Sequence, residues 1–104
     1  TDESLVHTNH CVVPALLPVE RERLPASRLS SLKRLDRGIE LLDTDGITPE
    51  FLMELTRDPQ SICVRATPPM HIETCGAAIM RPASGDLWAV WGLPSENEYE
   101  HFSV

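Results

Sequence analysis

The sequence predicts an α+β fold, in which two helices accompany an antiparallel sheet. Three observations favour this class: apolar residues recur at spacings of three and four within 27–43, a helix-start signature stands at 47–50, and two strand-like runs flank a turn-rich segment within 72–91. The first two patterns are helical and the third is typical of a hairpin. We expect residues 1–104 to form a single domain, or the C-terminal fragment of a larger one.

Residues 5–13 are expected to form the first strand. Four polar residues interrupt this apolar run: His7, Thr8, Asn9 and His10. Because side chains on a strand alternate between faces, Asn9 would share its face with His7 and Cys11. A carboxamide held on a rigid strand can donate a hydrogen bond to an oxyanion without titrating. The pattern therefore points to a site centred on Asn9, with an incidental polar face as the alternative.

The first helix is predicted over residues 27–43, after a proline-rich loop at 14–26. Ser27 is the expected N-cap. The apolar stripe consists of Leu29, Leu32, Leu35, Ile39 and Leu42. Gly38, in the middle of the helix, costs about 1 kcal/mol relative to alanine. We expect it to allow close packing, with drift as the alternative.

A second, short helix is predicted over residues 48–57. Thr48 is placed to cap it, and Pro49 and Glu50 occupy first-turn positions that favour proline and acidic residues. Asp58 and Pro59 end it. We expect this helix to serve as scaffold.

A hairpin is predicted over residues 72–91, and residues 95–104 are expected to be a polar tail. The second strand of the hairpin is apolar on both faces, since Trp88 and Val90 lie on one and Leu87 and Trp91 on the other. This pattern predicts a strand buried between two layers.

The charge balance argues against nucleic acid as a partner. The chain of 104 residues has 9 basic and 16 acidic residues, a net charge of −7, which opposes the electrostatic term of nucleic-acid binding. No apolar run approaches the length of a membrane span, so a membrane partner is not expected either. Basic residues gather within 21–37. We expect a solvated helix face there, or else a surface that meets a carboxylate or a coenzyme phosphate.

The cysteines and histidines predict no metal site. Three cysteines in no paired motif suggest neither disulfides nor zinc, so reduced thiols and a cytoplasmic location are expected. His7 and His10 would point to opposite faces of a strand, whereas metal ligands must converge. A self-contained Cys-His enzyme that pairs Cys11 with His71 or His101 is left open by the spacing.

Several short motifs together resemble a known family. They are Val6–His10 followed by Pro14, Ser30-Ser31 with Arg34, Gly46–Glu50, Ser61–Cys63, Thr74–Met80, Leu87–Val90 and Gly92–Pro94. In order and approximate spacing they resemble the C-terminal part of the isopenicillin-N acyltransferase-like (acyl-CoA:6-aminopenicillanic acid acyltransferase) family of N-terminal-nucleophile hydrolases. The resemblance runs from about Leu5 to Tyr99.

The resemblance implies a four-layer αββα sandwich and an amide hydrolase or acyltransferase. In that family an autoproteolytic cut exposes a cysteine whose own α-amine acts as base. The resemblance assigns Asn9 to oxyanion binding or orientation, with His7 in support. It suggests Arg34 and His71 as substrate-binding residues, although His71 stands where the family has an arginine. Coenzyme A is implied as a possible acyl carrier.

The resemblance places the nucleophile outside this chain, because the family's cysteine lies well upstream of the asparagine motif and only six residues precede His7. Cys11 lies in mid-chain and has no free α-amine. We therefore expect an upstream chain or segment to bring the cysteine, and a small acyl-amide or acyl-CoA substrate. Self-association is a further expectation, since half of a sandwich would leave a sheet face bare. A non-catalytic binding or interaction module on the same scaffold is the alternative function.

Overall fold

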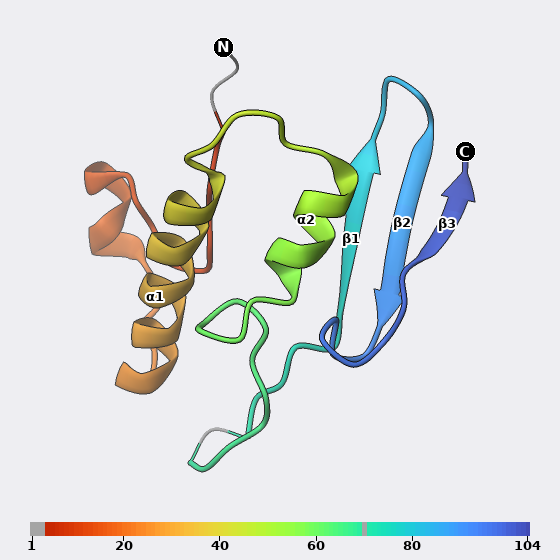
Figure 1. Ribbon diagram of the computed structural model, residues 1–104. Coiled ribbons are helices and arrows are strands. Elements are labelled where there is room, and N and C mark those ends of the chain that lie inside the picture. Colours follow the sequence, from red (N-terminus) through yellow and green to blue (C-terminus); the bar gives the residue numbers. More distant parts are fainter. Residues whose placement is uncertain (1–3, 70) are drawn as a thin grey trace. The chain divides into compact units, whose positions relative to one another are not determined.

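The computed structural model describes residues 4–69 and 71–104, and over these residues the chain is α+β (Figure 1). The elements, in order, are the 3-10 helix η1 (Pro14–Val19), the α-helices α1 (Pro25–Leu42) and α2 (Pro49–Thr56), and the strands β1 (Gly76–Arg81), β2 (Asp86–Trp91) and β3 (Glu100–Ser103). The chain divides into two compact units, Thr1–Asp43 and Thr44–Val104, here called unit 1 and unit 2. The predicted fold class, helices with an antiparallel sheet, is confirmed. The expectation of a single domain or a C-terminal fragment stays a prediction.

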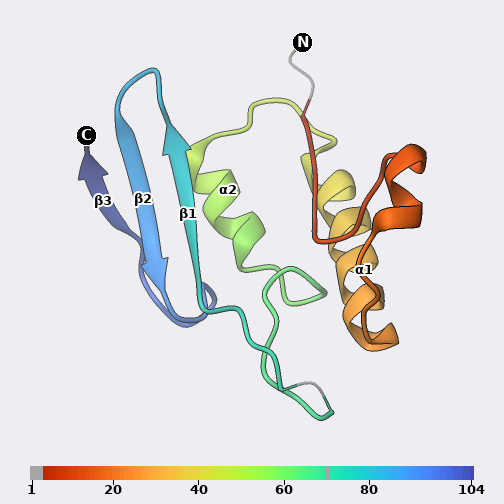
Figure 2. The same cartoon turned by 180° about the vertical axis from the view of Figure 1, so that it is seen from behind.

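The strand predicted over residues 5–13 is not formed. The segment is extended but unpaired, bends at Asn9 and His10, and runs alongside α1 (Figures 1 and 2). The physical reason is that the described part of unit 1 offers no neighbouring strand. Side chains of α1 take the place of a strand ladder, since the Asn9 N–H donates to the Ser31 hydroxyl at 2.9 Å.

Helix α1 begins at Pro25, two residues before the predicted start, so Ser27 lies inside the helix and is not its cap. Proline suits the first turn, where its missing N–H has no intrahelical partner. Gly38 is buried, and a Cβ added to it would lie 2.9 Å from Val6 Cγ1. The expected close packing at Gly38 is confirmed, and its neighbour is the extended N-terminal segment.

Unit 2 begins with α2, whose predicted cap is confirmed: Thr48 Oγ1 accepts from the Phe51 N–H at 3.1 Å. The predicted hairpin is also formed, although β1 starts at Gly76 and not at residue 72.

The expected polar tail at 95–104 is wrong in its second half, where β3 pairs antiparallel with β2. The register sets Phe102 opposite Leu87, so an apolar pair holds a strand whose other residues are polar.

The sheet buries one of its two faces. Its order is β1-β2-β3, and Ile79 and Val90, which share a face by register, are both buried. Helix α2 packs against β1. On the opposite face Trp91 is 80% exposed and Met80 is 69% exposed. The predicted burial of β2 between two layers is therefore met on one face only among the described residues.

Gly85 ends the turn between β1 and β2 at a position without room for a side chain. It adopts φ +69°, and a Cβ there would lie 2.6 Å from the backbone oxygen of Val104, which leaves no room for a side chain. We expect Gly85→Ala to lower the free energy of unfolding of unit 2 by about 2 kcal/mol, from backbone strain and the clash together. Chemical denaturation followed by tryptophan fluorescence measures this, because Trp88 and Trp91 lie on β2.

Gly46 is the matched control for this prediction. Its φ is +71°, but nothing lies within 4 Å of an added Cβ. Gly46→Ala should therefore show the strain alone and lose less stability than Gly85→Ala. Equal losses would mean that the approach of Val104 contributes nothing.

Candidate functional site

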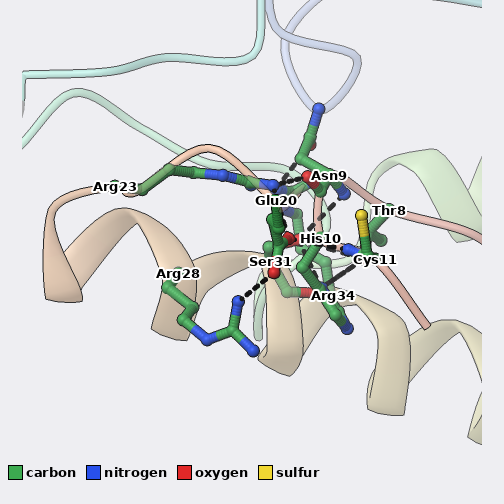
Figure 3. A network of polar contacts seen from close by, with 9 residues as sticks. All are labelled: Thr8, Asn9, His10, Cys11, Glu20, Arg23, Arg28, Ser31 and Arg34. Carbon is green, nitrogen blue, oxygen red and sulfur yellow. Dashed lines mark hydrogen bonds and ion pairs between the residues drawn. The ribbon is translucent and has the colours of Figure 1, made fainter. Parts of the chain in front are cut away.

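A polar network joins the N-terminal segment to α1 within unit 1 (Figure 3). Its members are Thr8, Asn9, His10, Cys11, Glu20, Arg23, Arg28, Ser31 and Arg34. They come from the extended segment, from the loop that follows η1 and from α1. The network has a buried half around Ser31 and a more exposed half around Asn9.

Ser31 is the centre of the buried half. It is 0% exposed, and its hydroxyl accepts from the Asn9 N–H and lies 2.8 Å from His10 Nδ1. The same hydroxyl donates to Thr8 Oγ1 at 3.1 Å, while the Thr8 hydroxyl donates to the Ser31 carbonyl at 3.0 Å. The Ser31 hydroxyl has one proton, which it donates to Thr8, so it can only accept in its contact with His10. This assigns the donated proton of that hydrogen bond to His10 Nδ1.

The Ser31 and His10 pair has the distance of a nucleophile and its base, but not the accessibility. His10 is 4% exposed, and no substrate carbonyl can approach the Ser31 oxygen. The Ser31 hydroxyl is also saturated by two donors and one acceptor. We therefore interpret Ser31 and His10 as a structural hydrogen-bonded pair that fixes the backbone at Asn9.

Asn9 lies at the exposed edge of the network. Its Oδ1 accepts from Arg34 NH2 at 3.0 Å, and its backbone carbonyl accepts from Arg23 NH2. With Oδ1 held by a guanidinium, the orientation of the carboxamide is set and Nδ2 is presented as the donor. No acceptor among the described residues occupies Nδ2. The arrangement can therefore donate a hydrogen bond to a bound carbonyl or anion.

Arg34 is a partly buried cation close to a second cation. Burial lowers the pKa of Arg34, and the positive charge of Arg23 lowers it further. In the part of the chain that the structure describes, no carboxylate pairs with Arg34. Its charge is therefore available to a ligand.

Glu20 ties the loop after η1 to both sides of the network. Its Oε1 accepts from the Cys11 N–H at 2.7 Å and from Arg23 at 3.0 Å, and its Oε2 accepts from Arg28 at 3.0 Å. The Cys11 hydrogen bond is the main cause of a lowered pKa of Glu20, to which Arg28 and Arg23 add. The ionised carboxylate is the form that holds the segment.

Acid should loosen unit 1 through Glu20. Because its pKa is lower in the folded state, its contribution to stability is complete above the unfolded pKa near 4.5 and is lost as the pH falls through the folded value. Between neutral pH and pH 3, the free energy of unfolding should fall less in Glu20→Gln than in the wild type. Denaturation at a series of pH values measures this. The neighbouring exposed Glu22→Gln should keep the wild-type dependence, and an unchanged profile in Glu20→Gln would contradict this role.

The structure brings two of the predicted site residues together, Asn9 and Arg34. His7 is exposed and makes no side-chain hydrogen bond to another described residue. His71 belongs to unit 2, where it is exposed with φ +51° and its N–H donates to the Thr67 carbonyl at 2.8 Å. The roles of His7 and His71 stay predictions.

Seven of the nine network residues were not predicted as site residues: Thr8, His10, Cys11, Glu20, Arg23, Arg28 and Ser31. The signal for Ser31 is its spacing from Gly38, because two small residues two turns apart mark a helix side that the chain can approach closely. Arg23 and Arg28 belong to the basic stretch 21–37, for which contact with an anion was the alternative to a solvated helix face. Glu20 stands in a loop, and its sequence carries no comparable signal.

No group of His, Cys, Asp or Glu residues suited to a metal ion occurs among residues 4–69 and 71–104. Cys11, Cys63 and Cys75 are free thiols. In the same residues, none of the helices combines the length and apolar character that a bilayer crossing requires.

Comparisons with protein-family models, with curated proteins and with solved structures give no match. The class that the fold defines is α+β with an open antiparallel sheet of β1, β2 and β3. The function must be argued from the site itself.

Proposed function

We propose that this chain is the C-terminal portion of an N-terminal-nucleophile amide hydrolase or acyltransferase, resembling the isopenicillin-N acyltransferase-like family, whose cysteine nucleophile lies outside these 104 residues. The observation that carries the proposal is the Arg34 hydrogen bond to Asn9 Oδ1 at 3.0 Å, with the carboxamide at the surface. It presents a fixed amide donor of the kind that such a site requires.

The chemistry assigned to Asn9 is stabilisation of an oxyanion. When a thiolate attacks an amide carbonyl, negative charge develops on the carbonyl oxygen, and a donor already in place stabilises it without reorganising. Asn9 Nδ2 is that donor in the proposal. Arg34 strengthens it, because a charged donor on Oδ1 polarises the carboxamide. His7, two residues away, would support the substrate from the exposed side.

The open face of the sheet supports the proposed αββα sandwich. Trp91, Met80 and Phe102 are exposed on one side of β1, β2 and β3, and they share that side with Leu87. Apolar sheet faces of this kind are covered in folded proteins. In the proposal a second sheet, from the segment that carries the cysteine, packs against this face.

A non-catalytic binding module is the second candidate. It is favoured by one observation: the guanidinium groups of Arg23 and Arg34 converge on Asn9 without help from another chain. A binding site for an anion does not require a nucleophile.

The identity of the partner tests the proposal. The protein is purified from its native source, and the intact masses and N-terminal sequences of all chains are determined. We expect a second chain or segment that begins with cysteine, and turnover of an acyl-amide by the assembly. Parallel assays with an acyl-CoA and an amine acceptor separate acyl transfer from hydrolysis. A lone, soluble and inactive 104-residue species would overturn the enzyme and favour the module.

A further inference from the structure

Two guanidinium groups meet at Asn9. Arg34 donates to its side-chain oxygen and Arg23 to its backbone oxygen (Figure 3). The two groups are close enough for the charge of Arg23 to act on Arg34. Such a like-charge approach is unfavourable unless a negative charge joins it.

The network does not supply enough negative charge. Glu20 is the one carboxylate among its nine residues, and it pairs with Arg23 and Arg28. Three guanidinium groups therefore face one carboxylate, and Arg34 is the group that Glu20 does not reach. A partly desolvated cation without a counter-ion gains free energy when an anion binds beside it.

Arg34 also has donors to spare. A guanidinium carries five N–H groups in a planar fork, and one hydrogen bond, to Asn9, is formed by Arg34 among the described residues. A fork of this kind binds a carboxylate or a phosphate through two parallel hydrogen bonds. Asn9 Nδ2 lies on the same residue that orients the fork, so one ligand can use both.

We propose that Arg34, assisted by Arg23, forms an oxyanion-binding subsite beside Asn9, which takes a carboxylate or phosphate substituent of the ligand. The assignment of that ligand as an amide substrate rests on the proposed function. The anion binding itself does not, because all of its residues belong to unit 1.

The test uses three probes on the full chain at constant ionic strength: N-acetylglycine, which carries an amide and a carboxylate, inorganic phosphate, and neutral N-acetylglycinamide. Binding is followed by NMR through the side-chain resonances of Asn9 and Arg34. We expect saturable shifts with at least one anion and none with the neutral amide. A preference for N-acetylglycine identifies a carboxylate substituent, and a preference for phosphate identifies a phosphorylated ligand or coenzyme.

Two variants make the test specific. Arg34→Gln should raise the dissociation constant of the anion about tenfold or more, as expected for the loss of a charged hydrogen bond. Arg37→Gln is the matched control on the same helix, where Arg37 pairs with Glu40 at 3.1 Å, and it should bind like the wild type. The subsite is overturned if neither anion saturates, if the neutral amide binds equally well, or if Arg34→Gln retains the affinity. If the chain binds an anion but proves to have no catalytic partner, the proposed subsite stands and only the proposed enzymatic function is overturned.

Discussion

Replacing Asn9 with alanine is expected to lower amide turnover by the assembled protein roughly a hundredfold, the usual effect of removing one oxyanion donor. The loss should fall on kcat more than on KM, because the donor acts on charge that develops in the transition state. Arg34 keeps its other donors in this variant, so anion binding should survive in part. Steady-state kinetics with a chromogenic acyl-amide provide the measurement.

Asn9→Asp separates donation from positioning. The aspartate still accepts from Arg34, and it forms a stronger, charged hydrogen bond than the amide does. It has no N–H to donate, so we expect turnover as low as that of Asn9→Ala. Wild-type turnover in Asn9→Ala would remove Asn9 from the site. Activity in Asn9→Asp but not in Asn9→Ala would make Asn9 a positioning residue for Arg34.

Replacing Ser31 with alanine is expected to cost about 3 kcal/mol of the stability of unit 1, since buried polar groups lose a shared partner. The Asn9 N–H and His10 Nδ1 each lose an acceptor, and Thr8 loses a donor. Water cannot replace the hydroxyl easily at a position that is 0% exposed. Hydrogen exchange of the amides of α1 and of Asn9 measures the loss.

The neighbouring Ser30 provides the matched control. It lies on the same turn of α1, is half-buried and forms no side-chain hydrogen bond with another described residue. Ser30→Ala should change stability by about 0.5 kcal/mol or less. Equal protection of the Asn9 amide from hydrogen exchange in the two variants would show that the hydrogen bonds of Ser31 do not hold the N-terminal segment.

The helices and the hairpin could be predicted because their signals are local. The apolar stripe of α1, the Thr48 cap of α2 and the turn residues between β1 and β2 lie within a few residues of the structure that they cause. Strands without a local partner were predicted poorly. Residues 5–13 have strand composition but no ladder, whereas β3 has a polar sequence and gains its pairing from β2. Strand pairing depends on what the rest of the chain presents.

In the candidate site, two of the residues could be predicted from the sequence, but the contacts between them could not. Asn9 and Arg34 were predicted separately, from a polar interruption and from the family resemblance, and the structure sets them 3.0 Å apart. Neither signal predicts that the two residues pair, because they lie 25 positions apart in the sequence and meet only in the fold. Ser31 was missed as the hub because a serine in a helix is ordinarily a surface residue, and its burial follows from the approach of the N-terminal segment.

Covalent trapping of the nucleophile decides whether this chain works with a cysteine that lies outside it. The assembled protein, with Cys11→Ser and Cys75→Ser to remove the two accessible thiols of this chain, is treated with iodoacetamide and assayed for amide turnover. Intact masses then locate the label. We expect full activity before treatment, complete loss after it, and one label on an N-terminal cysteine outside these residues. Activity that survives the reagent, or that the two serine substitutions already abolish, would contradict this expectation.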